Sequence, residues 1–258
     1  EAKKLSDDGV KELILVAQDV TRYGTDFDGK PHLIELLDKL SELDFEWIRL
    51  LYLYPEMVDD TLIQYVKNNP KIAKYMDIPL QHIDDQVLKR MNRRTDEKSI
   101  RELISKLKNA GIAVRTTFIC GFPGETQEQF EKLEKFVREV KFDYAGFFAY
   151  SREDGTPADK LDGHIDESVK EARAKKLAAV QERIIKNHNK ELIGKQVKVI
   201  YDDIDYEKQT FVGRTQTQAP DIDNVTLFSA DEEVKIGEFY TVEITGADGI
   251  DLVGKVIE

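Results

Sequence analysis

The chain has 258 residues, of which 34% are charged and 41% hydrophobic, a balance typical of a globular protein. It contains no run of about 18 apolar residues, so a membrane-spanning helix is not expected. The net charge of −12 argues against a broad nucleic-acid-binding surface. The single cysteine, Cys120, excludes disulfides and thiolate metal sites within the chain. The polar N-terminal stretch lacks the apolar core of a signal peptide, and we expect a cytoplasmic protein.

Strand-like runs alternate five times with amphipathic helical patterns along the first part of the chain. Residues 5–13 have the pattern of a helix end, interrupted by Gly9. The alternation predicts parallel strands joined by right-handed crossovers. The expected strands are 13–17, 47–53, 75–80, 114–120 and 143–150. The expected helices are 31–43, 61–68, 84–90, 99–110, 125–140 and 166–192.

The fourth strand leads through the turn Gly121-Phe122-Pro123-Gly124 into a helix that begins near Glu125. Two glycines and a proline force the chain to turn tightly there. Ligands of α/β proteins bind at such junctions, because backbone N–H groups and the helix dipole point out of them. The turn therefore predicts a ligand-binding position, with a compact turn that binds nothing as the alternative.

Distinctive polar loops follow all five predicted strands. Their sequences are QDVTRYG, YLYP, PLQH, GFPGET and YSREDGTP. The working groups of parallel sheets lie on the loops after the strand C-termini. These five loops therefore predict one common binding mouth.

From Gly194 onward the pattern changes to short β-rich runs separated by turns rich in Asp and Gly. The runs 196–201, 210–214, 224–228, 239–245 and 252–256 predict a small antiparallel barrel. Residues 194–258 contain 14 acidic and 6 basic residues, so they carry −8 of the total charge of −12. This charge favours a basic protein partner over tRNA, with a merely solvated acidic surface as the alternative.

The order and spacing of these motifs resemble a known family. PLQH followed by VLKRMNRR, GFPGET after the next strand and YSREDGTPA after the one following are similar to the methylthiotransferases of the radical S-adenosylmethionine superfamily. The resemblance covers nearly the whole chain, and the C-terminal barrel resembles the TRAM domain of that family. PLQH is similar to the branch that modifies a ribosomal protein, whereas the tRNA-modifying branch tends toward PVQSGS.

The resemblance implies an α/β fold in two domains. Residues 1–192 would form a partial TIM-like radical-SAM barrel with five of its six parallel strands, and residues 193–258 a small antiparallel, OB-like TRAM barrel. The family's three cluster-binding cysteines and its upstream domain have no counterpart in this chain. We therefore expect a fragment that is catalytically inactive by itself.

The resemblance also implies the chemistry of the intact enzyme. It would add a methylthio group to an aspartate β-carbon of the twelfth small-subunit ribosomal protein. Breaking such an unactivated C–H bond requires radical chemistry that a cofactor supplies. The implied cofactors are S-adenosylmethionine and two 4Fe–4S clusters, and a low-potential electron donor would reduce them.

Candidate site residues follow from placing the family's site on the strand-end loops. The expected S-adenosylmethionine contacts are Gln18, Gln81, Arg115, Gly121, Pro123, Gly124, Glu125 and Ser151. The expected substrate contacts are Asp19, Tyr23, His82, Arg93 and Arg94. Arg115 would pair with a carboxylate of the cofactor or of the target aspartate. The alternative is that Arg115 is a surface residue at the start of its strand. A structural role is the alternative for His82. We expect no catalytic residue and no metal ligand in this chain.

Two other functions remain open from the sequence. One is a tRNA methylthiotransferase of the same family, which the acidic barrel disfavours. The other is a non-catalytic docking module for a basic protein, a reading that the missing cysteines favour. Both would use the same fold.

Overall fold

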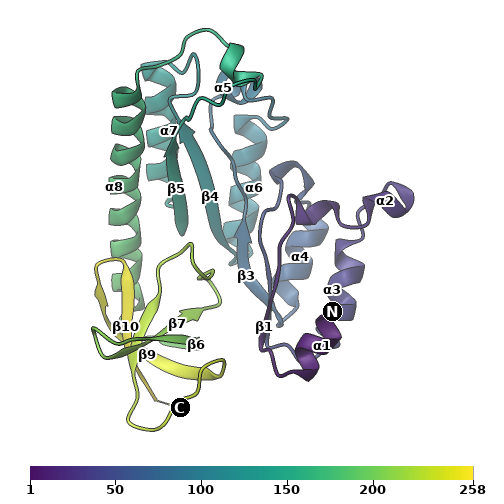
Figure 1. The fold of residues 1–258 in the computed structure, drawn as a ribbon, viewed down its shortest axis with the longest axis vertical. Helices are drawn as coiled ribbons and strands as arrows, with labels where there is room; N and C mark the ends of the chain where they lie inside the picture. The colour runs from purple at the N-terminus through teal and green to yellow at the C-terminus, as the bar shows by residue number, and fades with distance from the viewer. Residues whose placement is uncertain (258) are drawn as a thin grey trace.

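A computed structural model describes residues 1–257 and contains two β-structures (Figure 1). The first is an open sheet of five parallel strands in the order β1-β2-β3-β4-β5, and the second is a closed barrel in the order β10-β8-β7-β6-β9. The sheet strands are β1 (Glu12–Leu15), β2 (Trp47–Leu50), β3 (Ile72–Asp77), β4 (Ala113–Cys120) and β5 (Tyr144–Ala149). The barrel strands are β6 (Gln196–Asp205), β7 (Thr210–Thr215), β8 (Thr226–Ser229), β9 (Phe239–Asp248) and β10 (Asp251–Val256).

Helices connect the sheet strands and cover the convex face of the sheet. The α-helices are α1 (Ala2–Asp7), α2 (Thr25–Asp28), α3 (Leu33–Ser41), α4 (Asp60–Asn68), α5 (Asp85–Arg90), α6 (Glu97–Asn109), α7 (Gln127–Val140) and α8 (Glu167–Leu192). Short 3-10 helices are η1 (Val20–Arg22), η2 (Pro55–Met57) and η3 (Ala158–Lys160). Within the described residues, no helix is both long and apolar enough to cross a membrane.

The predicted partial parallel barrel followed by a small barrel is confirmed, with two local corrections. The N-terminal helix ends at Asp7 and does not reach residue 13, because Gly9 adopts a left-handed conformation (φ 87°) and residues 12–15 pair with β2. The C-terminal barrel is not wholly antiparallel, since β8 and β10 run parallel.

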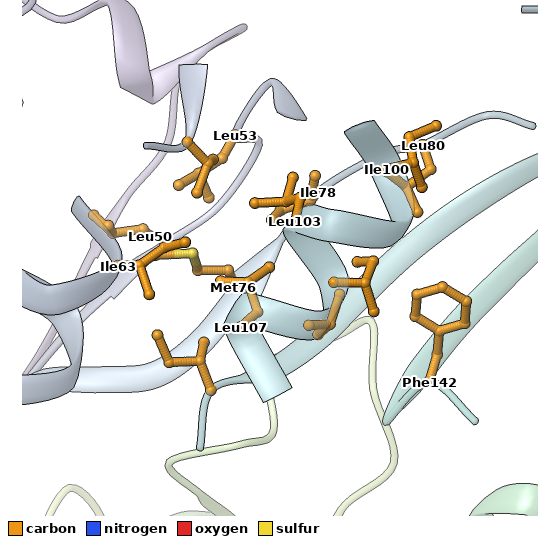
Figure 2. Close-up of a cluster of buried hydrophobic side chains, with 14 of the residues drawn as sticks. Leu50, Leu53, Ile63, Met76, Ile78, Leu80, Ile100, Leu103, Leu107 and Phe142 are labelled. Atoms are coloured by element: carbon orange, nitrogen blue, oxygen red, sulfur yellow. The ribbon is translucent and has the colours of Figure 1, made fainter. Parts of the chain in front are cut away.

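The main hydrophobic core lies between the sheet and its covering helices. Figure 2 shows Leu50 of β2 beside Ile63 of α4, Met76 of β3 near Leu107 of α6, and Ile78 beside Leu103 of α6. Capping boxes start α6 and α7, at Asp96 and Thr126 respectively, and fix where these helices begin. The alternation in β4 is clear: Val114, Thr116, Phe118 and Cys120 face the helices and are buried, whereas residues 115, 117 and 119 face the concave side and are half-buried.

A loop of the C-terminal barrel, residues 216–224, closes the concave side of the sheet at one end. Arg49 of β2 is fully buried there; its Nε donates to Glu12 (2.8 Å) and its Nη1 to the Gln216 carbonyl (2.8 Å). The guanidinium also lies 5.0 Å from the ring centre of Tyr75. Arg214 of β7 donates to the second oxygen of Glu12 at 2.6 Å. One buried carboxylate thus joins the sheet to the C-terminal barrel.

A second polar group lies beside it and contains Arg115. The Tyr75 hydroxyl donates to Asp223 Oδ2 (2.7 Å), and the Ala219 N–H donates to the same oxygen (2.9 Å). Arg115 pairs with Asp77 (3.0 Å) and with Asp223 Oδ1 (3.4 Å). Asp223, from the C-terminal barrel, is therefore held by three groups from both parts of the molecule.

These contacts place the C-terminal barrel at the N-terminal end of the sheet strands. Glu12 and Trp47 are the first residues of β1 and β2, and Trp47 packs edge-on against Phe239 of β9, 4.6 Å between ring centres. The loops after the strands lie at the opposite end, where Figure 1 shows α5. The acidic barrel and the predicted mouth are therefore at opposite ends of the sheet.

Asp223 predicts a pH-dependent step in stability. Burial raises the pKa of its carboxyl to about 6, although the Ala219 N–H, the Tyr75 hydroxyl and Arg115 oppose the shift. The folded state therefore holds a proton that an unfolded chain releases near its ordinary pKa of 3.8, so this group's stabilisation is lost as pH rises from about 4 to 6. Asp223→Asn should remove this loss, which is about 2–3 kcal/mol.

Urea unfolding of both proteins at a series of pH values measures the effect. The free energy of unfolding of D223N, minus that of the unaltered chain, should rise between about pH 4 and 7. Asp221→Asn changes an exposed carboxylate two residues away and is the matched control. A pH-independent difference for D223N would contradict the prediction.

Candidate functional site

The loops after the five strands form one end of the molecule, and the predicted site residues on them differ in exposure. Gln18, Ser151 and Arg94 are exposed, Tyr23 is 43% exposed, and Arg93 is half-buried. Gly124 is the exposed member of the GFPG turn, whereas Gly121 and Pro123 are buried. The structure thus gathers these predicted residues at one end of the molecule, although Gly121 and Pro123 are not accessible there.

The GFPG turn needs its two glycines for conformational and steric reasons. Gly121 (φ 75°) and Gly124 (φ 82°) both have left-handed backbones. A Cβ atom on Gly121 would lie 2.2 Å from Cγ of Lys170, and one on Gly124 would lie 2.9 Å from the Arg90 guanidinium carbon. Arg90 also donates from Nε to the Pro123 carbonyl at 3.0 Å. The turn is therefore packed tightly from two sides.

Three backbone N–H groups at this turn donate to acceptors inside the protein. The Gly121 N–H donates to Glu125 Oε2 (2.9 Å), and the Gly124 N–H donates to the Gly163 carbonyl (2.8 Å). The Glu125 N–H donates to the Phe122 carbonyl at 2.9 Å. These three N–H groups therefore donate within the protein in this structure and not out of the turn.

Glu125 is the centre of a buried polar group beneath the turn. Its side chain is inaccessible, and Arg173 of α8 donates to Glu125 Oε1 at 2.6 Å and to its carbonyl at 3.3 Å. His82 Nε2 lies 3.5 Å from the other carboxylate oxygen. Since the Asp84 N–H donates to His82 Nδ1 (3.0 Å), the neutral imidazole carries its hydrogen on Nε2, facing Glu125.

Four of the predicted contacts lie against other groups of the protein in this structure. Glu125 and His82 are buried; Arg173 binds Glu125, whereas His82 Nε2 has no hydrogen-bond partner among the described residues. Asp19 caps η1: it accepts from the Thr21 N–H and hydroxyl, from Arg22 Nε and from the Tyr54 N–H. Arg115 is occupied by two carboxylates of the chain itself, Asp77 and Asp223. All four side chains hold the mouth or the domain contact together.

Gln81 keeps the features of a ligand-binding residue. It is half-buried in the loop after β3 and has a left-handed conformation (φ 71°), a strained state for a residue with a side chain. The Gln81 N–H donates to the Thr117 carbonyl of β4 (2.8 Å), and the Gln81 carbonyl accepts from the Ile119 N–H of the same strand (2.9 Å). Its Oε1 atom is buried without a partner in the described part of the chain. Tyr52, after β2, has the same unusual backbone (φ 58°).

Sequence reasoning missed two basic residues of α8, Lys170 and Arg173. Both are nearly buried, and Lys170 donates to the Tyr150 carbonyl at the end of β5 (2.8 Å). The helical spacing offered a signal, because the buried stripe through Leu177 and Val180 extends back to positions 173 and 170. The two charges argued against a buried face, so only their partners could have revealed it.

Within the described residues, no group of three His, Cys, Asp or Glu side chains is arranged to hold a metal ion. Cys120 is buried on the helix-facing side of β4. Burial, and next the nearby Glu125 charge, raise the pKa of its thiol to about 12. Cys120 is thus a structural residue and not a thiolate ligand.

The Glu125–Arg173 pair predicts how the turn is held. Arg173→Met should leave the buried Glu125 carboxylate without its cation and lower the free energy of unfolding by about 3 kcal/mol. Because the freed carboxylate can reorient, the Gly121 amide should also exchange with solvent faster. Denaturant unfolding and amide hydrogen exchange measure the two effects.

Lys175→Met is the matched control, since Lys175 is exposed on the same helix. It should change stability by no more than about 0.5 kcal/mol and leave the Gly121 amide protected. Equal Gly121 exchange in both variants would show that Arg173 does not position the turn.

Comparison with known proteins agrees with this architecture. Residues 1–137 match the model of the radical SAM superfamily, and residues 193–257 match that of the TRAM domain. The solved structure of coproporphyrinogen III oxidase from Escherichia coli, described as a radical SAM enzyme, is similar in fold (TM-score 0.51). It is 15% identical, over 71% of this chain and 49% of that chain.

Curated relatives are similar over the full length of the chain. The ribosomal protein uS12 methylthiotransferase RimO of Elusimicrobium minutum is 45% identical over 100% of this chain. The protein of the same name from a Thermoanaerobacter species is 46% identical over 99% of it. The chain spans 59% and 58% of these two relatives. Because the radical SAM model matches more than half of the residues and the parallel sheet agrees with it, the chain belongs to the radical SAM superfamily, with a TRAM domain following its α/β part.

Proposed function

We propose that this chain provides the positioning part of a cytoplasmic radical methylthiotransferase that modifies ribosomal protein uS12 on an aspartate β-carbon. The observation that carries the proposal is the 45% identity to a uS12 methylthiotransferase over 100% of this chain, which includes both the α/β part and the TRAM domain. We also infer a domain division between residues 192 and 193, where α8 ends and the TRAM match begins.

Two cofactors accompany this function, and the described residues fit only one of them. A 4Fe–4S cluster does not fit, because the one thiol is buried and no metal-ligating group is present among residues 1–257. We therefore assign these residues no part in binding a cluster or in receiving electrons from the low-potential donor that would reduce it. S-adenosylmethionine fits the strand-end loops, where Gln81 Oε1 is buried without a partner. When bound, it supplies the hydrogen-abstracting chemistry that no side chain has.

The chain's own residues would bind and orient this cofactor. Gln81 would accept a hydrogen bond from it, held by its two backbone bonds to β4. Gly121, Pro123 and Gly124 would shape the wall beside it, with Gln18 and Ser151 on the neighbouring loops. Exposed aromatic surface is available from Phe148 of β5 (57% exposed). Arg173 and Glu125 would keep the turn in place without touching the ligand.

A basic ribosomal protein would dock through the acidic TRAM domain, which carries −8 of the chain's −12. That domain lies at the N-terminal end of the sheet strands, away from the loops that would hold the cofactor. A partner bound there would have to extend along the molecule to place its aspartate at the mouth, where Tyr23 is accessible. tRNA is not the expected partner of this acidic surface.

The test uses the complete protein encoded by the gene, reconstituted anaerobically with iron and sulfide. It is incubated with S-adenosylmethionine, a reductant, and either uS12 or total tRNA. Mass spectrometry should find a methylthio group on uS12, none on tRNA, and none on uS12 whose target aspartate is replaced by asparagine. Modified tRNA would establish the other branch of the family. Binding of uS12 without modification would indicate a docking module.

Gln81→Ala tests the cofactor site separately. Losing one hydrogen bond of about 1 kcal/mol should raise the Kd for S-adenosylmethionine about fivefold. Equilibrium dialysis with labelled cofactor measures this in the same reconstituted protein. Lys175→Gln, on the exposed face of α8, is the control and should bind normally. An unchanged Kd for Q81A would remove Gln81 from the site.

A further inference from the structure

Arg90, the last residue of α5, joins three of the strand-end loops. Its Nε atom donates to the Pro123 carbonyl of the GFPG turn at 3.0 Å. Its Nη2 atom donates to the Asp162 carbonyl (2.9 Å) and to Asp162 Oδ1 (2.8 Å), in the segment between β5 and α8. The loop after β3 carries Gln81 and leads into α5, the turn follows β4, and the segment after β5 carries Ser151. One side chain therefore links the three loops on which the proposed cofactor contacts lie.

The segment that joins β5 to α8, residues 150–166, lies directly on the turn; we call it the β5–α8 connection. The Gly124 N–H donates to the Gly163 carbonyl at 2.8 Å, and both glycines have left-handed backbones (φ 82° and 74°). A Cβ atom on Gly163 would lie 3.1 Å from the Cα atom of Gly124. The Arg90 guanidinium also lies against Gly124, since a Cβ atom there would be 3.0 Å from its Nε and Nη2 atoms. The arginine thus covers the place where the turn and the connection meet.

The contacts of Arg90 depend on the geometry of its donors more than on its charge. The Asp162 side chain is 92% exposed, and an ion pair between exposed groups contributes little to stability because water and salt screen it. The other two acceptors are backbone carbonyls of separate loops. A planar guanidinium reaches both carbonyls at once with donors in a fixed arrangement, which the single ammonium of a lysine cannot do. An arginine is therefore the side chain that suits this position.

We propose that Arg90 is a positioning residue for the S-adenosylmethionine site. It holds the β5–α8 connection on the GFPG turn, so that the loops after β3, β4 and β5 form one wall for the cofactor. Its Nε and Nη2 donors are occupied by protein acceptors, and it acts through these loops. The inference rests on the proposed function, which assigns S-adenosylmethionine to the strand-end loops.

Loss of Arg90 should loosen the connection without unfolding it. Leu161 of the connection packs against the buried cluster that contains Phe122 of the turn, and this apolar contact remains without the arginine. The Gly124–Gly163 hydrogen bond, in contrast, would be the only bond of the three named here that still ties the two loops. A cofactor would then have to order both loops as it binds, and that ordering reduces its affinity.

Two measurements on Arg90→Gln test this role. In the chain itself, the Gly124 amide should exchange with solvent about tenfold faster or more, whereas the Gly121 amide, bound to Glu125, should stay protected. In the complete protein, reconstituted anaerobically, equilibrium dialysis should find the Kd for S-adenosylmethionine raised about tenfold, as expected for one or two lost hydrogen bonds. Arg90→Lys keeps the charge and should bind the cofactor about as weakly as R90Q.

The matched control is Lys89→Gln, which removes the same charge from the neighbouring exposed residue of α5 and should change neither quantity. Guanidinium ion at millimolar, non-denaturing concentration should restore cofactor affinity to Arg90→Ala, and sodium ion should not. A structural defect elsewhere would not be rescued in this way, and unfolding curves verify that all variants fold.

The inference is overturned by an unchanged Kd for R90Q, by normal cofactor binding of R90K, by an equal loss in K89Q, or by a Gly124 amide that stays protected in R90Q. These measurements use no uS12. Unmodified uS12 with intact S-adenosylmethionine affinity would therefore contradict the proposed function and not this inference, whereas an unaltered protein that binds no S-adenosylmethionine would contradict both.

Discussion

The arrangement of this protein depends on buried polar side chains of α8 that donate hydrogen bonds to backbone carbonyls of other elements. The helix has 26 residues and is therefore about 39 Å long, and Figure 1 shows it running from the strand-end loops to the C-terminal barrel. Its buried donors are Lys170, Arg173, Gln181 and Asn189. Their carbonyl acceptors belong, in the same order, to Tyr150, Glu125, Phe142 and Ile250. Leaving a buried donor unpaired costs free energy, so each of these hydrogen bonds holds the segment that carries its acceptor against the helix.

The fold could be predicted from the sequence, because its signals are local and repeated. Apolar periods of two and of 3.6 residues, with turn residues between them, locate each strand and helix to within a few positions. The prediction of a helix up to Leu13 was wrong, because the helix ends before Gly9, which has a left-handed conformation, although the apolar periodicity continues beyond it. The parallel pairing of β8 with β10 could not be inferred, since strand direction in a small barrel depends on contacts between distant residues.

The candidate site could be predicted only as a location. Sequence placed polar groups after each strand, but it could not say which of them the protein uses internally. Glu125 is bound by Arg173, 48 residues further along the chain, and Asp19 accepts from the distant Tyr54 N–H as well as from its neighbours Thr21 and Arg22. Arg115 shows the same limit: its side chain faces the concave side, where Asp223 enters from 108 residues further along the chain. Such pairs form only after folding, so no spacing rule reveals them.

The distribution of charge gives the molecule two unlike ends. The C-terminal barrel, at −8, lies at the N-terminal end of the sheet strands, and Arg93 and Arg94 follow α5 at the other end. The buried Glu12 carboxylate joins Arg49 of the sheet to Arg214 of the barrel, so the two ends keep a fixed orientation. Salt screens charges from one another beyond the Debye length of about 8 Å. The two ends are several times further apart, so a partner at one end does not sense the charge of the other. The net charge of −12 is therefore an average over two unlike ends and describes neither of them.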